Sequence, residues 1–264
     1  MTISRSAGRL GLLSLFLLGL GSGASSVAQN APRPAPSLQK TLSHIDTLRS
    51  QGHFRTALAR IDSLQPDHPN EVDLLWRRAL LLSDVGRRLD DEDDTIDHHR
   101  RALQVADSAR AADSTHAWAH LVTALAAGRL TLHVGASKRV RYSRTVKRHC
   151  DRALALDSTL APAYHLRGRW YREVADIGFF KRTLVRAFYG GLPDASFSEA
   201  VADFQQAIAL ESKPYNHLEL GKTYLKMDRE DDARRQLHRA LNTSGSPFEA
   251  EHKREARALL SELQ

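Results

Sequence analysis

The chain has 264 residues, of which 42% are hydrophobic and 26% are charged, and its formal net charge at pH 7 is +7. This length is enough to bury a substantial core in one large or elongated domain. Cys150 is the only cysteine, which excludes an intrachain disulfide. The net charge is modest for this size and disfavours a nucleic-acid-binding protein, which usually carries a denser basic face.

The N-terminal segment, Met1–Ala28, has the features of a signal peptide. Arg5 and Arg9 precede the apolar stretch Leu10–Leu20, which is shorter than the roughly 20 residues that a spanning helix needs. Small residues follow as far as Ala28, near which cleavage is predicted. We therefore expect an exported protein, either periplasmic or secreted. An uncleaved N-terminal anchor is the alternative interpretation.

Residues 29–37 are predicted to form a proline-rich linker between the signal and the folded domain. Its segment Ala31–Ser37 reads APRPAPS. Each proline fixes φ and removes a backbone donor, which favours an extended chain. The rest of the chain, residues 38–264, is predicted to be one domain.

A pattern of small and large residues recurs along residues 38–264. It is clearest in Pro214–Pro247, where the small residues Gly221, Ala233 and Ala240 occupy the positions at which two helices of a repeat touch. Their spacing matches the 34-residue tetratricopeptide repeat, in which small residues let two antiparallel helices approach closely. Because the pattern recurs in tandem, it predicts an all-α, right-handed tetratricopeptide-repeat solenoid and disfavours a non-repeating helical bundle.

Five helix pairs and a C-terminal capping helix are expected. The predicted units are 38–71, 73–113, 115–157, 161–211 and 214–247, and the cap is 248–263. Each of the three middle units contains an insertion between its two helices, the longest lying between Gly168 and Ala200, and we expect these insertions to form enlarged turns. A cap with a polar outer side is what the end of a solenoid needs.

The longest insertion and its flanks resemble a known family. The run Ala161–Leu192, then Ser196–Ala200 (SFSEA) and Leu220–Lys226 (LGKTYLK), is similar to the regulator of microtubule dynamics family, as is Glu71–Gly86. The resemblance implies a tetratricopeptide scaffold with no established active site, and no cofactor is expected. Some animal members bind microtubules, membranes or lipids. The predicted signal peptide sets this sequence apart from those members.

The predicted concave groove is lined by side chains from the first helix of each pair. When the repeats of this chain are matched to one another, the expected ligand-binding residues are Arg77, His165, Arg169, Arg172, Tyr215, Leu218 and Lys222. Cations predominate among them, and the planar guanidinium group binds a carboxylate or phosphate through two parallel hydrogen bonds. We therefore predict a non-catalytic scaffold that holds a peptide or protein segment in a cationic groove.

Residues 177–189, within the longest insertion, predict a second contact surface. Ile177, Phe180, Leu184 and Phe188 recur at helical spacing, with cations on the other side. The expected contact residues are Phe179, Phe180, Lys181, Arg182, Arg186, Phe188 and Tyr189. Such a helix suits an anionic lipid, a membrane surface or a partner's groove. Alternatively, it packs onto its own solenoid and buries its aromatic side chains.

The acidic run Asp90–Asp94, together with Asp97, His98 and His99, contains residue types that bind divalent metals. It lacks the glycine and the terminal glutamate of a calcium-binding loop. The run is therefore interpreted as a solvated inserted turn, and no metal site is predicted.

Two further segments are interpreted as structural. The basic run Lys138–Arg148 could bind nucleic acid, but a solvated helix face is favoured. His149 and Cys150 are neighbours on a predicted helix, where adjacent side chains diverge by about 100°, so they do not face each other. With no H-E-x-x-H, G-x-S-x-G or phosphate-binding glycine loop in the sequence, an enzyme is not predicted.

Overall fold

The computed structural model describes residues 36–263, so the predicted signal peptide, its cleavage site near Ala28 and most of the predicted linker lie outside the described residues. The described elements are α1 (Pro36–Ser50), α2 (Phe54–Leu64), α3 (Val72–Gly86), α4 (Glu92–Ala112), α5 (Ala117–Leu130), η1 (Thr131–His133, a 3-10 turn), α6 (Ala136–Leu156), α7 (Ala161–Ala175), α8 (Phe179–Tyr189), α9 (Phe197–Leu210), α10 (Pro214–Leu225), α11 (Glu230–Asn242) and α12 (Glu249–Glu262). The last two residues of the predicted linker, Pro36 and Ser37, already belong to α1.

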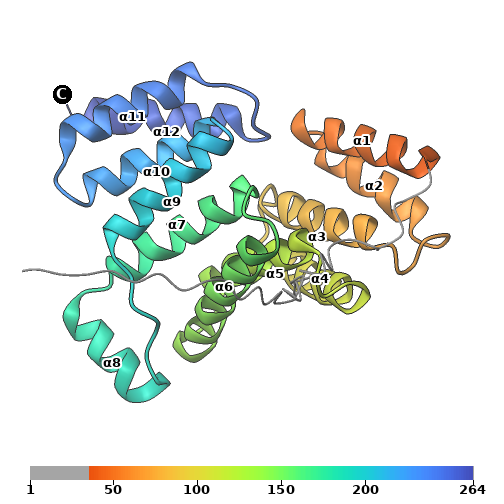
Figure 1. Cartoon of the computed structure of the whole chain (residues 1–264), viewed down its shortest axis with the longest axis horizontal. Coiled ribbons are helices and arrows are strands. Elements are labelled where there is room, and N and C mark those ends of the chain that lie inside the picture. Colours follow the sequence, from red (N-terminus) through yellow and green to blue (C-terminus); the bar gives the residue numbers. More distant parts are fainter. Residues whose placement is uncertain (1–35, 264) are drawn as a thin grey trace, which may run out of the picture. The chain divides into compact units, whose positions relative to one another are not determined.

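Successive helices form antiparallel pairs that stack on one another (Figure 1). The pairs are α1 with α2, α3 with α4, α5 with α6, α7 with α9, and α10 with α11. The first helices also contact one another, α3 against α5 and α5 against α7, and α12 packs on α10 and α11. Between residues 36 and 263 there is no β-strand. The predicted all-α solenoid of five pairs with a capping helix is confirmed.

Two of the three insertions lengthen a helix, so the prediction that they form enlarged turns was wrong. Both α4 and α6 have 21 residues, whereas α2 has 11 and α11 has 13. The acidic run explains where α4 begins: the side chain of Asp91 accepts a hydrogen bond from the backbone N–H of Asp94 at 2.8 Å. Carboxylates in the first turn also interact favourably with the helix dipole. The third insertion, between α7 and α9, carries the separate helix α8.

In two of the pairs, α7 with α9 and α10 with α11, close approach depends on a glycine in the first helix. A Cβ atom on Gly168 would lie 3.1 Å from the ring of Phe204 on α9, and one on Gly221 would lie 3.0 Å from Leu237 on α11. Phe204 and Leu237 are both fully buried. The glycines therefore provide the space that these large side chains fill, as the repeat spacing predicted.

The first helix pair also contacts the cap, although the two are far apart in sequence. Phe248, just before α12, stacks on Phe54 of α2 with ring centroids 4.9 Å apart. Arg87, at the end of α3, lies 4.0 Å from the centroid of the Phe248 ring and pairs with Glu251 of α12 at 2.5 Å. The cap is thus held by the first two pairs as well as by its own neighbours.

Several histidines are buried as neutral rings. Nε2 of His120 lies 3.0 Å from the carbonyl oxygen of Ser114, and Nδ1 of His120 lies 2.9 Å from Nδ1 of His149. A carbonyl can only accept, so His120 donates from Nε2 and accepts at Nδ1, and His149 must then donate. Burial, followed by nearby arginines, lowers the pKa of His149 to about 4. Burial also lowers the pKa of His99 and of His252 to about 4.

We predict that Gly168→Leu destabilises the protein, because the new side chain would overlap the Phe204 ring. Overpacking of this kind lowers the free energy of unfolding by about 1–3 kcal/mol, so the midpoint of thermal unfolding should fall by roughly 3–10 °C. The matched control is Gly135→Leu, since a Cβ at Gly135 has no neighbouring atom within 4 Å. Equal midpoints for the two variants would show that the helix crossing is not close at Gly168.

We also predict that acid destabilises the fold through these histidines. The unfolded chain takes up protons near pH 6.5, whereas the folded chain resists protonation of His99, His149 and His252 until about pH 4. The free energy of unfolding, measured by urea denaturation, should therefore be level above about pH 7 and fall as the pH drops from 6.5 toward 4.

Two variants test whether buried histidine rings cause this pH dependence. His149→Gln should reduce the slope between pH 6.5 and 4, because one depressed pKa is removed. His44→Gln should leave the slope unchanged, because His44 is exposed. If the wild-type stability were flat across this window, the buried rings would not be neutral as described.

Candidate functional site

The predicted groove residues do not all meet at one place. Arg77 on α3 lies apart from the others, held by Asp46 of α1 at 3.0 Å and by Asp73 at 2.8 Å. Its guanidinium group also packs 4.0 Å from the centroid of the Trp76 ring. Arg77 is buried, and both of its acidic partners come from this chain. The structure therefore gives Arg77 a role in joining α1 to α3.

Three of the other predicted cations converge on one carboxylate that the sequence analysis did not identify. Glu219 of α10 is buried, and its carboxylate forms an ion pair with Arg172 of α7 at 2.5 Å. The same carboxylate lies 3.4 Å from Nζ of Lys222 and 3.8 Å from Nε of Arg169. Burial alone would raise the pKa of Glu219, but the three cations hold it well below its usual value. The carboxylate therefore stays charged and binds α7 to α10.

The remaining predicted groove residues pack beneath or beside the cap. Leu218 is buried in the same hydrophobic cluster as Leu260 of α12, so its prediction as a groove residue was wrong and it is a packing residue. The ring of Tyr215 lies 4.7 Å from His165 and 5.8 Å from His252, measured between ring centroids. These contacts arise because α12 covers α10 in the way that a further repeat would.

His165 is held as a neutral ring at the same junction. Its Nδ1 lies 2.8 Å from the side-chain oxygen of Asn216 on α10, so that nitrogen donates to the oxygen. Burial lowers the pKa of His165 to about 3. The ring therefore supplies a fixed hydrogen bond between α7 and α10 and remains uncharged at neutral pH.

The inner face, defined here by Arg129, Arg169, Glu219 and Lys222, is where a ligand could reach charged groups of the first helices. The side chain of Arg169 is 41% exposed and that of Lys222 is 30% exposed. Lys222 is also paired with Glu255 of α12 at 2.8 Å. Of the cations predicted here, Arg169 is the most accessible and the most loosely paired.

Arg129 of α5 was missed by the sequence analysis. Burial lowers its pKa to about 10, and the next causes are the charges of Arg169 and Arg87. A sequence signal for it does exist: the dipeptide Gly-Arg recurs at Gly86 and Gly128, each in the last turn of a first helix. Arg87 and Arg129 thus occupy equivalent positions in successive repeats.

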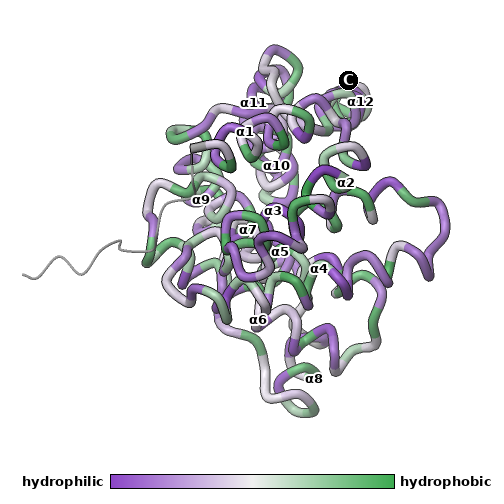
Figure 2. Tube along the Cα trace, turned by 90° about the vertical axis from the view of Figure 1, so that its right-hand side faces the viewer, coloured by the Kyte–Doolittle hydropathy of each residue, from purple (hydrophilic) through white to green (hydrophobic). Residues whose placement is uncertain are grey.

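The inserted helix α8 stands away from the stacked pairs, as Figures 1 and 2 show from two directions. Its main helix neighbour is α6. Phe188 is 73% exposed, Leu184 is 39% exposed and Tyr189 is 36% exposed. The side chains of Phe179 and Phe180 lie outside the described part of the structure. The alternative prediction, that the insert packs onto the solenoid and buries its aromatic side chains, was therefore wrong for Phe188 and Tyr189.

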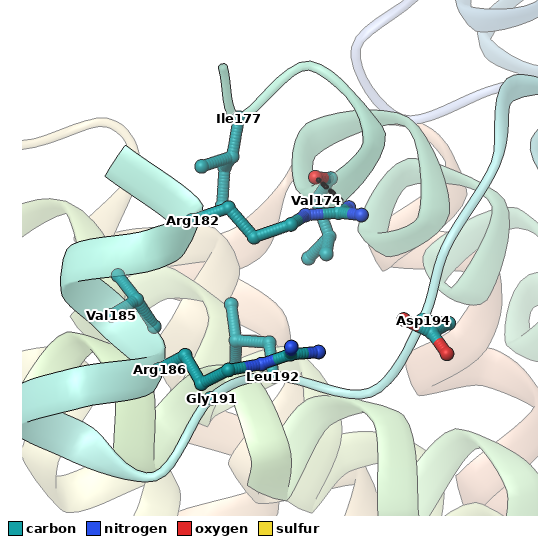
Figure 3. Close-up of a pocket in the computed structure, with 8 residues that line it drawn as sticks. All are labelled: Val174, Ile177, Arg182, Val185, Arg186, Gly191, Leu192 and Asp194. Atoms are coloured by element: carbon teal, nitrogen blue, oxygen red, sulfur yellow. Dashed lines mark hydrogen bonds between the residues drawn. The ribbon is translucent and has the colours of Figure 1, made fainter. Parts of the chain in front are cut away.

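The attachment of α8 uses arginine and backbone carbonyls. Arg144 of α6 donates to the carbonyl oxygens of Tyr189 and Gly191, and Arg182 of α8 donates to that of Val174 at 3.1 Å. Figure 3 shows Arg182 and Arg186 extending from α8 into a small pocket between α7, α8 and the loop after α8. Arg182 and Arg186 therefore line this pocket, and both are exposed to solvent, as is Lys181.

The other segments considered from the sequence have structural positions. In the part of the chain from residue 36 to 263, no group of three or more His, Cys, Asp or Glu residues is arranged to hold a metal ion. Cys150 is buried, and burial raises the pKa of its thiol. The basic run Lys138–Arg148 lies within α6, largely exposed over its N-terminal half. None of the helices in the described residues has both the length and the apolarity to span a bilayer.

Comparison with known proteins agrees with the fold. The sequence model of the family described as "Regulator of microtubule dynamics protein 1-3" matches residues 41–264. Regulator of microtubule dynamics protein 3 of Xenopus laevis is 30% identical over 135 residues, which cover 51% of this chain and 29% of that protein. Regulator of microtubule dynamics protein 1 of Mus musculus is 26% identical over 175 residues, which cover 62% of this chain and 55% of that protein.

A solved structure shows the same fold. A thermophilic TPR protein of Thermus thermophilus superposes with a TM-score of 0.60, covering 84% of this chain and 98% of its own, at 23% identity. The chain spans only 29% and 55% of the length of the two curated relatives above, so their full activities do not transfer. The family match nevertheless extends over nearly all the described helices. The chain belongs to the regulator of microtubule dynamics protein 1-3 family.

Proposed function

We propose that this protein is a non-catalytic scaffold that holds a peptide or protein segment against its inner face, after export directed by the segment Met1–Ala28. The observation that carries the proposal is the accessible cationic charge on the first helices, above all that of Arg169, whose side chain is 41% exposed. Solenoids of helix pairs present extended surfaces suited to binding chain segments. The fold shared with the tetratricopeptide protein supports this class of function.

The charge of the inner face favours an acidic segment. Glu219 offers one negative charge to three cations. Arg172 has a second acidic partner in Glu173 at 2.9 Å, and Lys222 has one in Glu255 at 2.8 Å. Arg169 remains 3.8 Å from the shared carboxylate, which is too long for a direct hydrogen bond. Its guanidinium can therefore turn toward a carboxylate of a ligand without breaking a short ion pair.

The titratable groups around this face are committed to structure, which supports binding over catalysis. The pKa of His165 is lowered to about 3, so the ring is a poor general base near neutral pH. Arg172 and Glu219 are buried against each other at 2.5 Å. Neither group is poised to exchange a proton with a bound molecule.

We predict that Arg169→Glu removes partners that the wild-type chain captures in a quantitative pull-down. The substitution reverses the most accessible charge of the inner face and places it beside Glu219, so acidic segments should be repelled. The measurement is mass spectrometry of captured proteins, with peptide binding confirmed by fluorescence anisotropy using a labelled oligoglutamate peptide. Affinity for that peptide should fall by at least about tenfold.

Arg257→Glu is the matched control, because Arg257 is an exposed arginine of α12 and its replacement makes the same change in net charge. It should retain the partners and the peptide affinity. Arg172 is unsuitable for this test, because its replacement would leave Glu219 without its closest partner. Identical partner sets and affinities for wild type and Arg169→Glu would exclude the inner face as the binding surface.

A second candidate function, binding of an anionic lipid surface, is favoured by the exposure of α8. Leu184 and Phe188 project from a helix that the solenoid does not cover. Lys181 on α8, and Lys138 and Arg148 on neighbouring α6, are exposed cations. Exposed apolar side chains flanked by cations suit the interface of a negatively charged bilayer.

For this second function we predict that Leu184→Ser weakens binding to vesicles of phosphatidylglycerol and phosphatidylcholine in a sedimentation assay. Losing one inserted leucine should reduce the partition coefficient by about tenfold. Leu210→Ser is the matched control, because Leu184 and Leu210 are each 39% exposed and Leu210 lies on α9. Equal loss in both variants, or no binding by the wild type at low salt, would reject α8 as a membrane contact.

A further inference from the structure

Two arginines of the inner face have a buried nitrogen with no hydrogen-bond partner. They are Arg129 of α5 and Arg169 of α7, and in each the buried, unpaired atom is Nε. Among the described residues Arg129 forms no ion pair or hydrogen bond, and the nearest carboxylate to Arg169 is Glu219 at 3.8 Å. Both side chains are only partly buried, so their outer nitrogens can be reached from solvent.

The acids near Arg129 are already bound by other cations. Asp84 is paired with Arg49 at 2.7 Å. Glu251 is paired with Arg87 at 2.5 Å and lies 3.7 Å from Arg88. No carboxylate close to Arg129 is therefore free to turn toward it.

The neighbourhood also has an excess of positive charge. The groups gathered here are the cations Arg49, Arg87, Arg88, Arg129, Arg169, Arg172 and Lys222 and the acids Asp84, Glu173, Glu219, Glu251 and Glu255. Seven cations against five acids leave an excess of two, which matches the two arginines whose Nε atoms are unpaired. Partly buried charges of like sign repel, and such groups are normally paired.

We propose that Arg129 and Arg169 form a binding site for an oxyanion, a carboxylate or phosphate group, on the inner face. The two residues lie on α5 and α7, the first helices of adjacent repeats, so one anion between them would bridge the repeats. Arg87 adds a third positive charge nearby. Guanidinium groups bind both kinds of oxyanion through paired N–H donors. The anion site itself does not depend on the proposed function. The identity of the molecule that carries the anion, a peptide or protein segment, does rest on it.

The pKa of Arg129 supports this site. Burial, and after it the positive charges of Arg169 and Arg87, lower this pKa to about 10 despite the opposing effect of Asp84 and Glu251. A bound anion would relieve both effects, because it replaces lost water and screens the repulsion between the arginines. Binding should therefore stabilise the folded protein.

The test is thermal unfolding of the full chain at pH 7.5 or so, in sodium phosphate, sodium acetate or sodium chloride of matched ionic strength. Phosphate or acetate at about ten times its dissociation constant should raise the unfolding midpoint by roughly 3–6 °C over chloride. The more stabilising salt distinguishes a phosphate carrier from a carboxylate carrier. Isothermal titration calorimetry with inorganic phosphate and with acetate measures the same binding directly.

Arg129→Gln should abolish this response and should melt at or above the wild-type midpoint in chloride, because a like-charge repulsion is removed. Arg169→Gln tests the same site independently if the first variant does not fold. Arg257→Gln, at an exposed arginine of α12, should keep the full anion response. A response of equal size in the wild type and both site variants, or none in the wild type, would overturn the site. These experiments use only phosphate and acetate, so a failure of the anion site can be distinguished from a failure of the proposed peptide binding, which the pull-down tests.

Discussion

The close crossing of α7 with α9 and of α10 with α11 is the constraint on which the other features depend. Where Gly168 faces Phe204 and Gly221 faces Leu237, the first helix can present only one side to its partner helix. Because residues three and four apart lie on the same face of a helix, this contact fixes the rotation of the first helix about its own axis. The side chains one position beyond each glycine, Arg169 and Lys222, are thereby directed toward the same carboxylate. Packing in the core thus determines the electrostatics of the inner face.

Glu219 changes what the inner-face cations can do. A carboxylate taken out of water must be paired, and pairing it with Arg172 at 2.5 Å leaves that arginine structural. The longer contact of 3.8 Å leaves Arg169 attached to the network yet able to receive another anion. One buried acid therefore separates the cations into those that hold α7 to α10 and those that remain available.

The sequence was sufficient for the fold because repeat spacing is a local property: each helix pair lies within one predicted unit, the longest of which is 161–211. It was insufficient for the site because ion pairs join distant positions: Arg49 meets Asp84, and Arg87 meets Glu251 164 residues later. The length of α4 was predictable from the cap at Asp91, had the acidic run been interpreted as a helix start. The exposure of α8 was not predictable from the sequence. Its apolar residues at helical spacing, with cations on the other side, suited a helix packed on the solenoid equally well.

The two cationic surfaces of this protein differ in how water and salt act on them. The inner face is partly buried among helices, where charges are weakly screened and an unpaired arginine is costly. The cations of α8 and α6 are exposed, and at physiological salt their attraction extends only about 8 Å. Exposed Phe188 adds an apolar contact that salt does not screen. The proposed ligand of the inner face would therefore be selected by the fit of its anion to Arg129 and Arg169. A surface that met α8 would instead be selected by its charge density and its capacity to admit an aromatic ring.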